Sequence, residues 1–118
     1  MENVSKLLPL GWIFAHMSFA LPVKRLYESE NLVAFYHPHP SYPFHVLLVP
    51  KHAVRNLMEL STADSAFWVD LLHAVQILVK RFDLETTGYR LIVNGGPNQD
   101  IQQLHFHLIS ETSCPIQS

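Results

Sequence analysis

The sequence predicts a single α+β domain whose sheet is largely antiparallel. Two short strand-like runs near residue 30 are joined by a polar turn, and two more near the C-terminus are joined by a short loop. Between these pairs lie a third apolar run and a long stretch with helical periodicity. Strands and helices do not alternate as parallel βαβ units require, so antiparallel pairing is expected. The 118 residues fit one domain spanning residues 1–118.

The apolar stretch from Leu7 to Leu21 is predicted to form a buried N-terminal helix. It also has features of a secretion signal, because it follows Lys6 and ends in small residues. Glu2 in the would-be basic region and Pro9 inside the apolar run argue against export, and the stretch is too short to span a bilayer. A helix is therefore favoured over a targeting segment for residues 1–20.

The next predicted elements are three strands. Residues 23–27 and 31–36 form a hairpin around a polar turn at 28–30. Three prolines in residues 37–43 exclude a helix or a central strand there, because proline removes a backbone donor and fixes φ. Residues 44–49 are nearly all apolar, which predicts an interior strand that ends at Pro50.

Two helices are predicted after this strand. Residues 56–60 suggest a short helix, and the capping-box spacing of Ser61 and Asp64 is expected to begin the longest one. Apolar residues then recur at helical spacing, with polar residues on the opposite side. The predicted apolar stripe consists of Phe67, Trp68, Leu71, Leu72, Val75, Leu78, Val79 and Phe82.

The C-terminal pair of strands carries the most informative pattern in the chain. After Gly88, residues 89–94 predict a strand, residues 94–98 a tight polar loop, and residues 103–109 a strand of alternating polar and apolar residues. Side chains of a strand alternate between faces, so Gln103, His105 and His107 share one face, opposite the apolar face. Two imidazoles therefore project into the same space.

Composition limits the classes of partner. The formal net charge is −2, with eight histidines counted as neutral, so the chain has no broad basic field. Long tracts of nucleic acid and anionic membranes are therefore not expected, whereas a small anionic ligand is compatible. Cys114 is the single cysteine, which excludes an internal disulfide and a multi-cysteine zinc site. It suits a reducing compartment, and a cytoplasmic protein is expected.

Three kinds of chemistry fit the histidine strand. His105 and His107 could pack as structural side chains. They could form half of a metal site, with His45, His39 or His37 as a third ligand. Alternatively, one imidazole could attack phosphorus while its neighbour donates a hydrogen bond. The spacing alone leaves these alternatives open.

The surroundings of this strand resemble the histidine triad (HIT) superfamily of nucleotide hydrolases and transferases. Asn94 and Gln99 precede the alternating run, and the block at residues 43–52 lies far upstream in the expected order. The resemblance extends over residues 22–110. It implies a HIT-like α+β fold with an antiparallel sheet of about five strands, one long helix and one or two shorter ones. It also implies a homodimer with one continuous sheet, and no cofactor.

The resemblance assigns catalytic roles to the strand. His105 takes the place of the nucleophile, which forms a nucleotidyl-histidine at the α-phosphate of a nucleoside 5′-phosphate conjugate, and His107 hydrogen-bonds a phosphate or leaving-group oxygen. Gln103 stands where the family has its first triad histidine. A backbone carbonyl at this position orients the nucleophile, so we expect altered or slower turnover, since glutamine cannot titrate.

The resemblance also implies a nucleotide-binding pocket. Its substrate-binding residues are Asn94, Gln99, His45, His37, Phe35 and Leu47. Asn94 and Gln99 lie on the phosphate side, and Phe35 or Leu47 would contact the base. His37 stands where many members have an acidic residue for the ribose hydroxyls, and a neutral imidazole accepts only one hydrogen bond.

Two rival functions follow from the same residues. A protein that binds nucleotides without turnover fits the glutamine at position 103 and the histidine at position 37. A metal-dependent hydrolase would use His45, His105 and His107 as ligands. The resemblance favours the nucleotide hydrolase or transferase over both.

Overall fold

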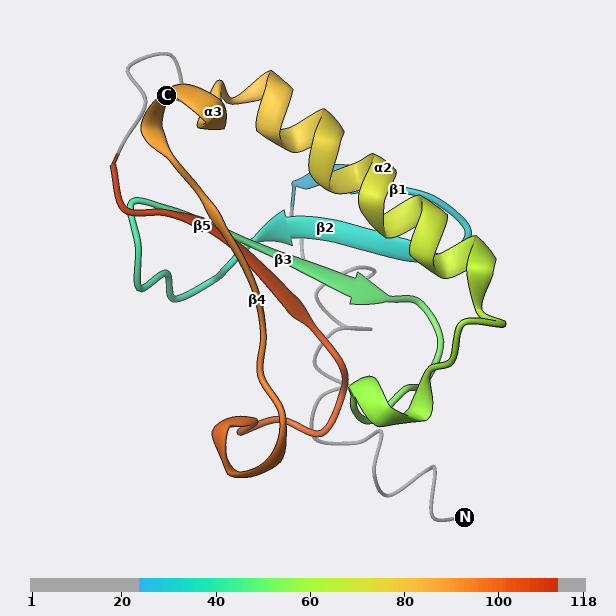
Figure 1. The fold of residues 1–118 in the computed structure, drawn as a ribbon. Helices are drawn as coiled ribbons and strands as arrows, with labels where there is room; N and C mark the ends of the chain where they lie inside the picture. Colours follow the sequence, from blue (N-terminus) through green and yellow to red (C-terminus); the bar gives the residue numbers. More distant parts are fainter. Residues whose placement is uncertain (1–23, 113–118) are drawn as a thin grey trace.

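A computed structural model of the chain describes residues 24–112, which form a five-stranded sheet with helices packed on one face (Figure 1). The strands are β1 (Arg25–Glu28), β2 (Leu32–Tyr36), β3 (Phe44–Pro50), β4 (Arg90–Val93) and β5 (Phe106–Ser110). Their order across the sheet is β1-β2-β3-β5-β4, and every neighbouring pair is antiparallel. This confirms the predicted α+β class and the antiparallel sheet of about five strands.

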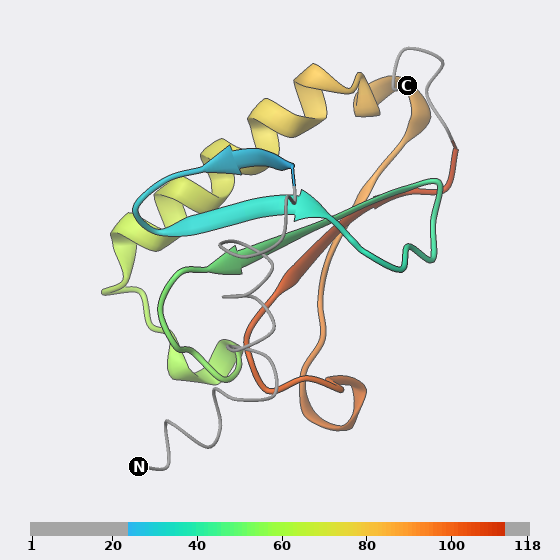
Figure 2. The ribbon, with the colours of Figure 1, turned by 180° about the vertical axis from the view of Figure 1, so that it is seen from behind.

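The sheet has two apolar faces of different extent. Alternate residues of β3, such as Val46 and Leu48, join Leu108 of β5 in the main core against the long helix. The opposite face carries a smaller buried cluster of Val33, Phe35, Leu47 and Val49. Figure 2 shows this second face, with the helix behind the sheet. Because residues alternate along a strand, the histidines of β3 and β5 belong to this second face.

The long helix α2 (Ser65–Arg81) confirms the predicted apolar stripe with one exception. Its buried residues include Phe67, Leu71 and Leu78, but Leu72 is 59% exposed. Leu72 lies one residue beyond Leu71, about 100° further round the helix, so both cannot face the sheet. Ala74 completes the buried stripe instead.

The predicted start of α2 at Ser61 is wrong by one turn. Asp64 is the N-cap residue, and its backbone carbonyl accepts hydrogen bonds from Phe67 and Trp68. The Asp64 carboxylate accepts a hydrogen bond from the Ser61 backbone at 2.8 Å. The Ser61–Asp64 pair thus closes the turn that precedes the helix.

The shorter elements lie in the connections. The predicted short helix is a single 3₁₀ turn, η1 (Leu57–Glu59), and a second one, η2 (Gly96–Asn98), lies in the loop before β5. A short helix that the sequence did not predict, α3 (Leu84–Thr87), follows α2. Its anchor is the fully buried Leu84.

Asp70 of α2 attaches the first hairpin to the helix. Its carboxylate accepts hydrogen bonds from the Tyr27 and Ser29 hydroxyls, and from the Asn31 amide at 3.5 Å. The bond to Asp70, together with burial, raises the pKa of Tyr27 to about 12. The half-buried Asp70 carboxylate therefore holds the β1–β2 hairpin against α2.

Two sequence predictions fall outside the described residues. The N-terminal helix expected at residues 7–21 and the single cysteine, Cys114, both belong to the undescribed segments. Among residues 24–112, no helix is long and apolar enough to cross a membrane.

Candidate active site

One cross-strand row defines the centre of the second sheet face. Phe35 of β2 pairs with Leu47 of β3, Leu47 pairs with His107 of β5, and His107 pairs with Ile92 of β4. Directly paired residues of antiparallel strands point to the same face. The apolar residues predicted for the base and the histidine predicted for the phosphate therefore lie side by side.

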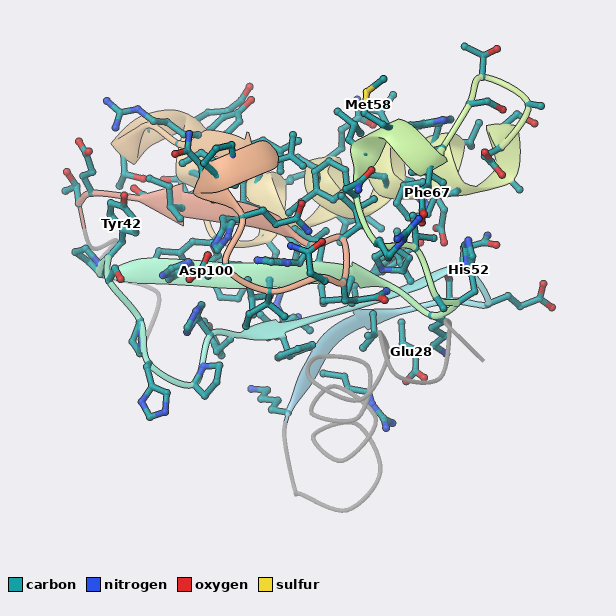
Figure 3. The ribbon with its side chains drawn as sticks, turned by 90° about the horizontal axis from the view of Figure 1, so that it is seen from below. Glu28, Tyr42, His52, Met58, Phe67 and Asp100 are labelled. Atoms are coloured by element: carbon teal, nitrogen blue, oxygen red, sulfur yellow. The ribbon has the colours of Figure 1, made fainter. Side chains whose placement is uncertain are left out.

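Four imidazoles gather beside this row. The ring of His107 lies 5.0 Å from that of His105 and 5.2 Å from that of His45, measured between centroids. The ring of His37 is tilted against that of His45 at 4.4 Å and lies nearly parallel to that of His107 at 6.3 Å. The sheet thus brings together residues from β5, from β3 and from the loop that precedes β3. In Figure 3, Tyr42 and His52 mark the two ends of β3.

His105 is oriented by a backbone carbonyl. Its Nδ1 lies 2.7 Å from the Gln103 carbonyl oxygen, which can only accept. The proton is therefore on Nδ1, and in the neutral ring Nε2 carries the lone pair. This is the tautomer that a nucleophile acting through Nε2 requires.

His107 is protonated on the other ring nitrogen, Nε2. Nε2 of His45 lies 2.9 Å from Nδ1 of His107, and Nδ1 of His45 accepts a hydrogen bond from the Ser41 backbone at 3.0 Å. Burial, followed by neighbouring histidines, lowers the pKa of His45 and of His107 to about 4. Both rings are therefore neutral at pH 7.

The tautomer of His37 is also determined by a backbone N–H. Its Nδ1 accepts a hydrogen bond from the His39 backbone at 2.9 Å, so the proton of the neutral ring is on Nε2. Burial, followed by His39 and His105, lowers the pKa of His37. Its ring has no acceptor left for a ligand, whereas the sequence had suggested one.

The side chain of Gln103 is buried and bridges the chain after β3. Its Nε2 donates to the His52 carbonyl at 3.0 Å, and its Oε1 accepts from the Val54 backbone at 3.4 Å. The neighbouring Leu104 backbone donates to the Val54 carbonyl at 2.7 Å. The Gln103 side chain therefore connects the segment just before β5 to residues 52–54, and its backbone carbonyl orients His105.

The two predicted phosphate-side residues differ in environment. Gln99 is buried, and its Nε2 donates to the carbonyls of Arg55 and Ile101 at 2.7 and 2.8 Å. Both amide hydrogens are thus engaged, and donation to a phosphate would break one of these bonds. Asn94 is half-buried at the end of β4, and its side chain makes no hydrogen bond within residues 24–112.

The residues predicted for the base offer little surface. Phe35 is 2% exposed and Leu47 is 4% exposed, within the smaller apolar cluster. Both lie in the row of residues that contains His107, but their burial leaves little of either side chain for a base.

The histidine cluster is not arranged as a metal site. Among residues 24–112, no group of three or more histidine, cysteine, aspartate or glutamate side chains could hold a metal ion. Nδ1 of His45 already accepts a backbone hydrogen bond, and its Nε2 faces His107. The metal-dependent alternative gains no support from this geometry.

A family model for the HIT domain matches residues 19–113 of the chain. The chain belongs to the HIT domain family. A relative from Synechococcus elongatus, an uncharacterised HIT-like protein, is 34% identical over 95 residues, which cover 79% of this chain and 82% of the relative.

Solved structures of HIT proteins share the fold. A HIT family hydrolase from Clostridium thermocellum superposes with a TM-score of 0.75 at 29% identity, covering 85% of this chain and 90% of the hydrolase. A histidine triad nucleotide-binding protein from Candida albicans gives a TM-score of 0.73 at 27% identity, covering 86% of this chain and 75% of that protein.

Two contacts of the histidine cluster were missed by sequence reasoning. The Ser41 backbone N–H contacts His45, and Tyr42 packs edge-on against the same ring at 5.3 Å. The signal in the sequence is the proline at positions 38, 40 and 43, which leaves few backbone donors in the loop. A backbone contact carries no side-chain pattern, so this signal could not identify its target.

Proposed function

We propose that this protein is a nucleotide hydrolase or transferase that acts at the α-phosphate of a nucleoside 5′-phosphate conjugate. The observation that carries the proposal is that two neighbouring histidine rings are protonated on different nitrogens. His105 has its proton on Nδ1, against the Gln103 carbonyl, and His107 has its Nδ1 engaged by His45. One ring thus offers a nucleophilic lone pair, and the other offers an N–H donor.

The proposed reaction has two steps. Nε2 of His105 attacks the α-phosphorus, a P–N bond forms, and the bond to the leaving group breaks. The positive charge on the ring is stabilised through Nδ1–H by the Gln103 carbonyl. His107 donates a hydrogen bond to a phosphoryl or leaving-group oxygen. Water or another acceptor then attacks phosphorus and gives up its proton to solvent, while the P–N bond breaks and its electron pair returns to Nε2.

Gln103 is proposed to occupy the first triad position. Its carbonyl orients His105 whatever the side chain is, so nucleophilic attack does not need an imidazole there. Its buried amide does not titrate and so cannot act as a general acid or base. The expected consequence is turnover slower than an imidazole at this position would give.

The substrate is proposed to be nucleotide-like because of the relatives. One solved neighbour is described as a HIT family hydrolase and another as a histidine triad nucleotide-binding protein. Asn94, Gln99, His45 and His37 are proposed to surround the phosphate and sugar. Phe35 and Leu47 are proposed to face the base after local rearrangement, since both are buried.

A homodimer is proposed through the β4 edge. β4 lies at one end of the strand order, and Tyr89 and Leu91 are 46% and 44% exposed there. An exposed edge strand can pair with a second copy and extend the sheet. Light scattering of the wild type and of a Leu91→Lys variant tests this, and a monomeric wild type would contradict it.

The test of the function is capture of the intermediate. Rapid quenching with a nucleoside phosphoramidate labelled in the nucleoside should leave acid-labile label on the protein. His105→Ala should abolish the label, and His52→Ala, which removes an exposed ring outside the cluster, should retain it. A wild type that binds nucleotide but never acquires label would show that the protein is a binding module.

A further inference from the structure

The loop between β2 and β3 directs its few backbone donors into the histidine cluster. Prolines at positions 38, 40 and 43 leave N–H groups only on His37, His39, Ser41 and Tyr42. His37 donates to the His45 carbonyl at 2.9 Å, His39 donates to the ring of His37, and Ser41 donates to the ring of His45. Three of the four donors therefore contact the residues of the site.

The Ser41 contact determines where the protons of two rings lie. A ring nitrogen that accepts a backbone N–H cannot carry a proton, so His45 is neutral and is protonated on Nε2. This Nε2–H faces Nδ1 of His107 at 2.9 Å, so Nδ1 of His107 is the acceptor. The proton of neutral His107 is therefore on its Nε2.

The direction of the hydrogen bonds from Ser41 through His45 to His107 is set only at the Ser41 end. Ser41 N–H can donate but cannot accept, whereas each imidazole can adopt either tautomer. Without the Ser41 donor, the His45–His107 bond could reverse, with Nδ1 of His107 donating to Nε2 of His45. Nε2 of His107 would then present a lone pair to a phosphate oxygen, where it now presents a hydrogen.

We infer that the Ser41 backbone N–H is a positioning group that fixes the tautomer of His107 through His45, so that His107 is a hydrogen-bond donor while His105 offers a lone pair. The chemical consequence rests on the proposed function, but the proton positions do not. The Ser41 N–H and the two ring nitrogens of His45 act through His107, so this role needs no hydrogen bond from either residue to the substrate.

The neighbouring charges agree with this arrangement. Burial, followed by His37 and His107, holds the pKa of His45 at about 4, and Nδ1 of a charged ring would oppose the Ser41 donor. Burial, followed by His105 and His37, lowers the pKa of His107, which Asp100 raises only in part. Both rings therefore stay neutral at pH 7, and only a neutral imidazole has a tautomer to be fixed.

The first test measures proton positions in the wild type. In ¹⁵N-histidine-labelled protein at pH 7, ring shifts distinguish protonated from unprotonated nitrogens. We expect His45 and His107 to be protonated on Nε2, and His105 to be protonated on Nδ1. A protonated Nδ1 on His45 or His107 would overturn the inference, whether or not the protein has the proposed activity.

The second test removes the donor. Ser41→Pro eliminates the N–H, and an amide-to-ester replacement at position 41 does so without changing the side chain. Both should give mixed tautomers at His45 and His107, and Ser41→Ala, which keeps the N–H, should retain the wild-type ring shifts. If Ser41→Pro does not fold, the ester decides. Unchanged ring shifts in the ester variant would overturn the inference.

The kinetic result separates this role from a structural one. With a nucleoside phosphoramidate, loss of the Ser41 N–H should lower kcat by roughly tenfold or more, with KM nearly unchanged, because a transition-state donor is lost. A rise in KM alone, with kcat retained, would contradict the inference. If the wild type has the expected tautomers but no turnover, the proposed function fails and the proton assignment remains.

Discussion

Nε2 of His45 and Nδ1 of His107 share a hydrogen bond of 2.9 Å between strands β3 and β5. The bond joins two rings whose pKa values burial, followed by nearby histidines, lowers to about 4. A pair of neutral imidazoles inside the site is therefore part of the folded state at neutral pH. This relationship links the stability of the sheet to the chemistry of its histidine face.

Stability should decrease in mildly acidic solution because of these two rings. In the unfolded chain both histidines titrate near 6.5, whereas in the folded protein they titrate near 4. Between these values the unfolded state binds more protons, so the free energy of unfolding falls as the pH falls from about 6.5 to about 4. Thermal unfolding at pH 7.5 and 4.5 measures this. The slope should be smaller in His45→Gln, and an equal slope in the variant would contradict the assignment.

Much of the fold could be predicted because it depends on repeating patterns. The alternation at Leu104, Phe106 and Leu108 predicted one buried face for residues 103–109, and all three are in the core. The strand itself is shorter than predicted, because β5 begins at Phe106 and His105 lies just before it. The apolar stripe of α2 was predicted for the same reason, except at Leu72. Leu71 and Leu72 are adjacent in sequence and therefore about 100° apart around the helix, so Leu72 is exposed. The one-turn helix α3 is too short to show a period.

The proximity of the site histidines could be predicted in part. His105 and His107 were expected to be neighbours from their spacing, and His45 from the family resemblance. The proton positions could not be predicted, because they depend on the carbonyl of Gln103 and the N–H of Ser41. Backbone groups are present at every residue, so only the folded geometry shows which of them bind a ring.

Asp70 should be important for stability, although the sequence places it on the polar side of α2. Its replacement by alanine leaves the half-buried Tyr27 and Ser29 hydroxyls without their acceptor. We expect a loss of about 1–3 kcal/mol in the free energy of unfolding, measured by denaturant titration. Glu85→Ala, which removes an exposed carboxylate from α3, is the control and should change it by much less. Equal effects would contradict the anchoring role.

The titration of Tyr27 tests the same contact independently. The hydrogen bond to Asp70 is the main cause that raises its pKa to about 12, because the bonded phenol must lose its proton next to a carboxylate. In Asp70→Asn, which keeps the shape but removes the charge, the pKa of Tyr27 should fall towards its usual value of about 10. Phenolate absorbance against pH measures this, and an unchanged titration would rule out the contact.

Gln103 allows the backbone and side-chain contributions to be separated. Gln103→Ala removes the hydrogen bonds to His52 and Val54 but keeps the carbonyl that orients His105. The free energy of unfolding should fall by about 1–3 kcal/mol, while the nucleotidyl-histidine still forms. Loss of the label in a folded Gln103→Ala protein would show that the side chain is needed for attack.

Gln103→His tests the expectation that turnover is limited at the first triad position. The carbonyl is retained and a titratable ring is introduced, so kcat for a nucleoside phosphoramidate should rise, by a few-fold to tenfold if proton transfer limits the rate. The unfolding midpoint measured beside it reports whether the imidazole fits the buried space. An unchanged or lower kcat in a stable variant would mean that glutamine is adapted to a different substrate.

His37 should determine how the site responds to a sugar diol. Its Nδ1 is engaged by the His39 backbone, so the neutral ring offers one donor and no acceptor. His37→Asp supplies two acceptor oxygens, and each hydroxyl that donates to the carboxylate is worth about 1.5–3 kcal/mol at most. The preference for a ribonucleoside over a 2′,3′-dideoxynucleoside phosphoramidate, measured as a ratio of kcat/KM, should therefore rise at least several-fold. His37→Asn, with the same shape but no charge, should raise it less. An equal ratio in the wild type and in His37→Asp would show that position 37 does not meet the sugar.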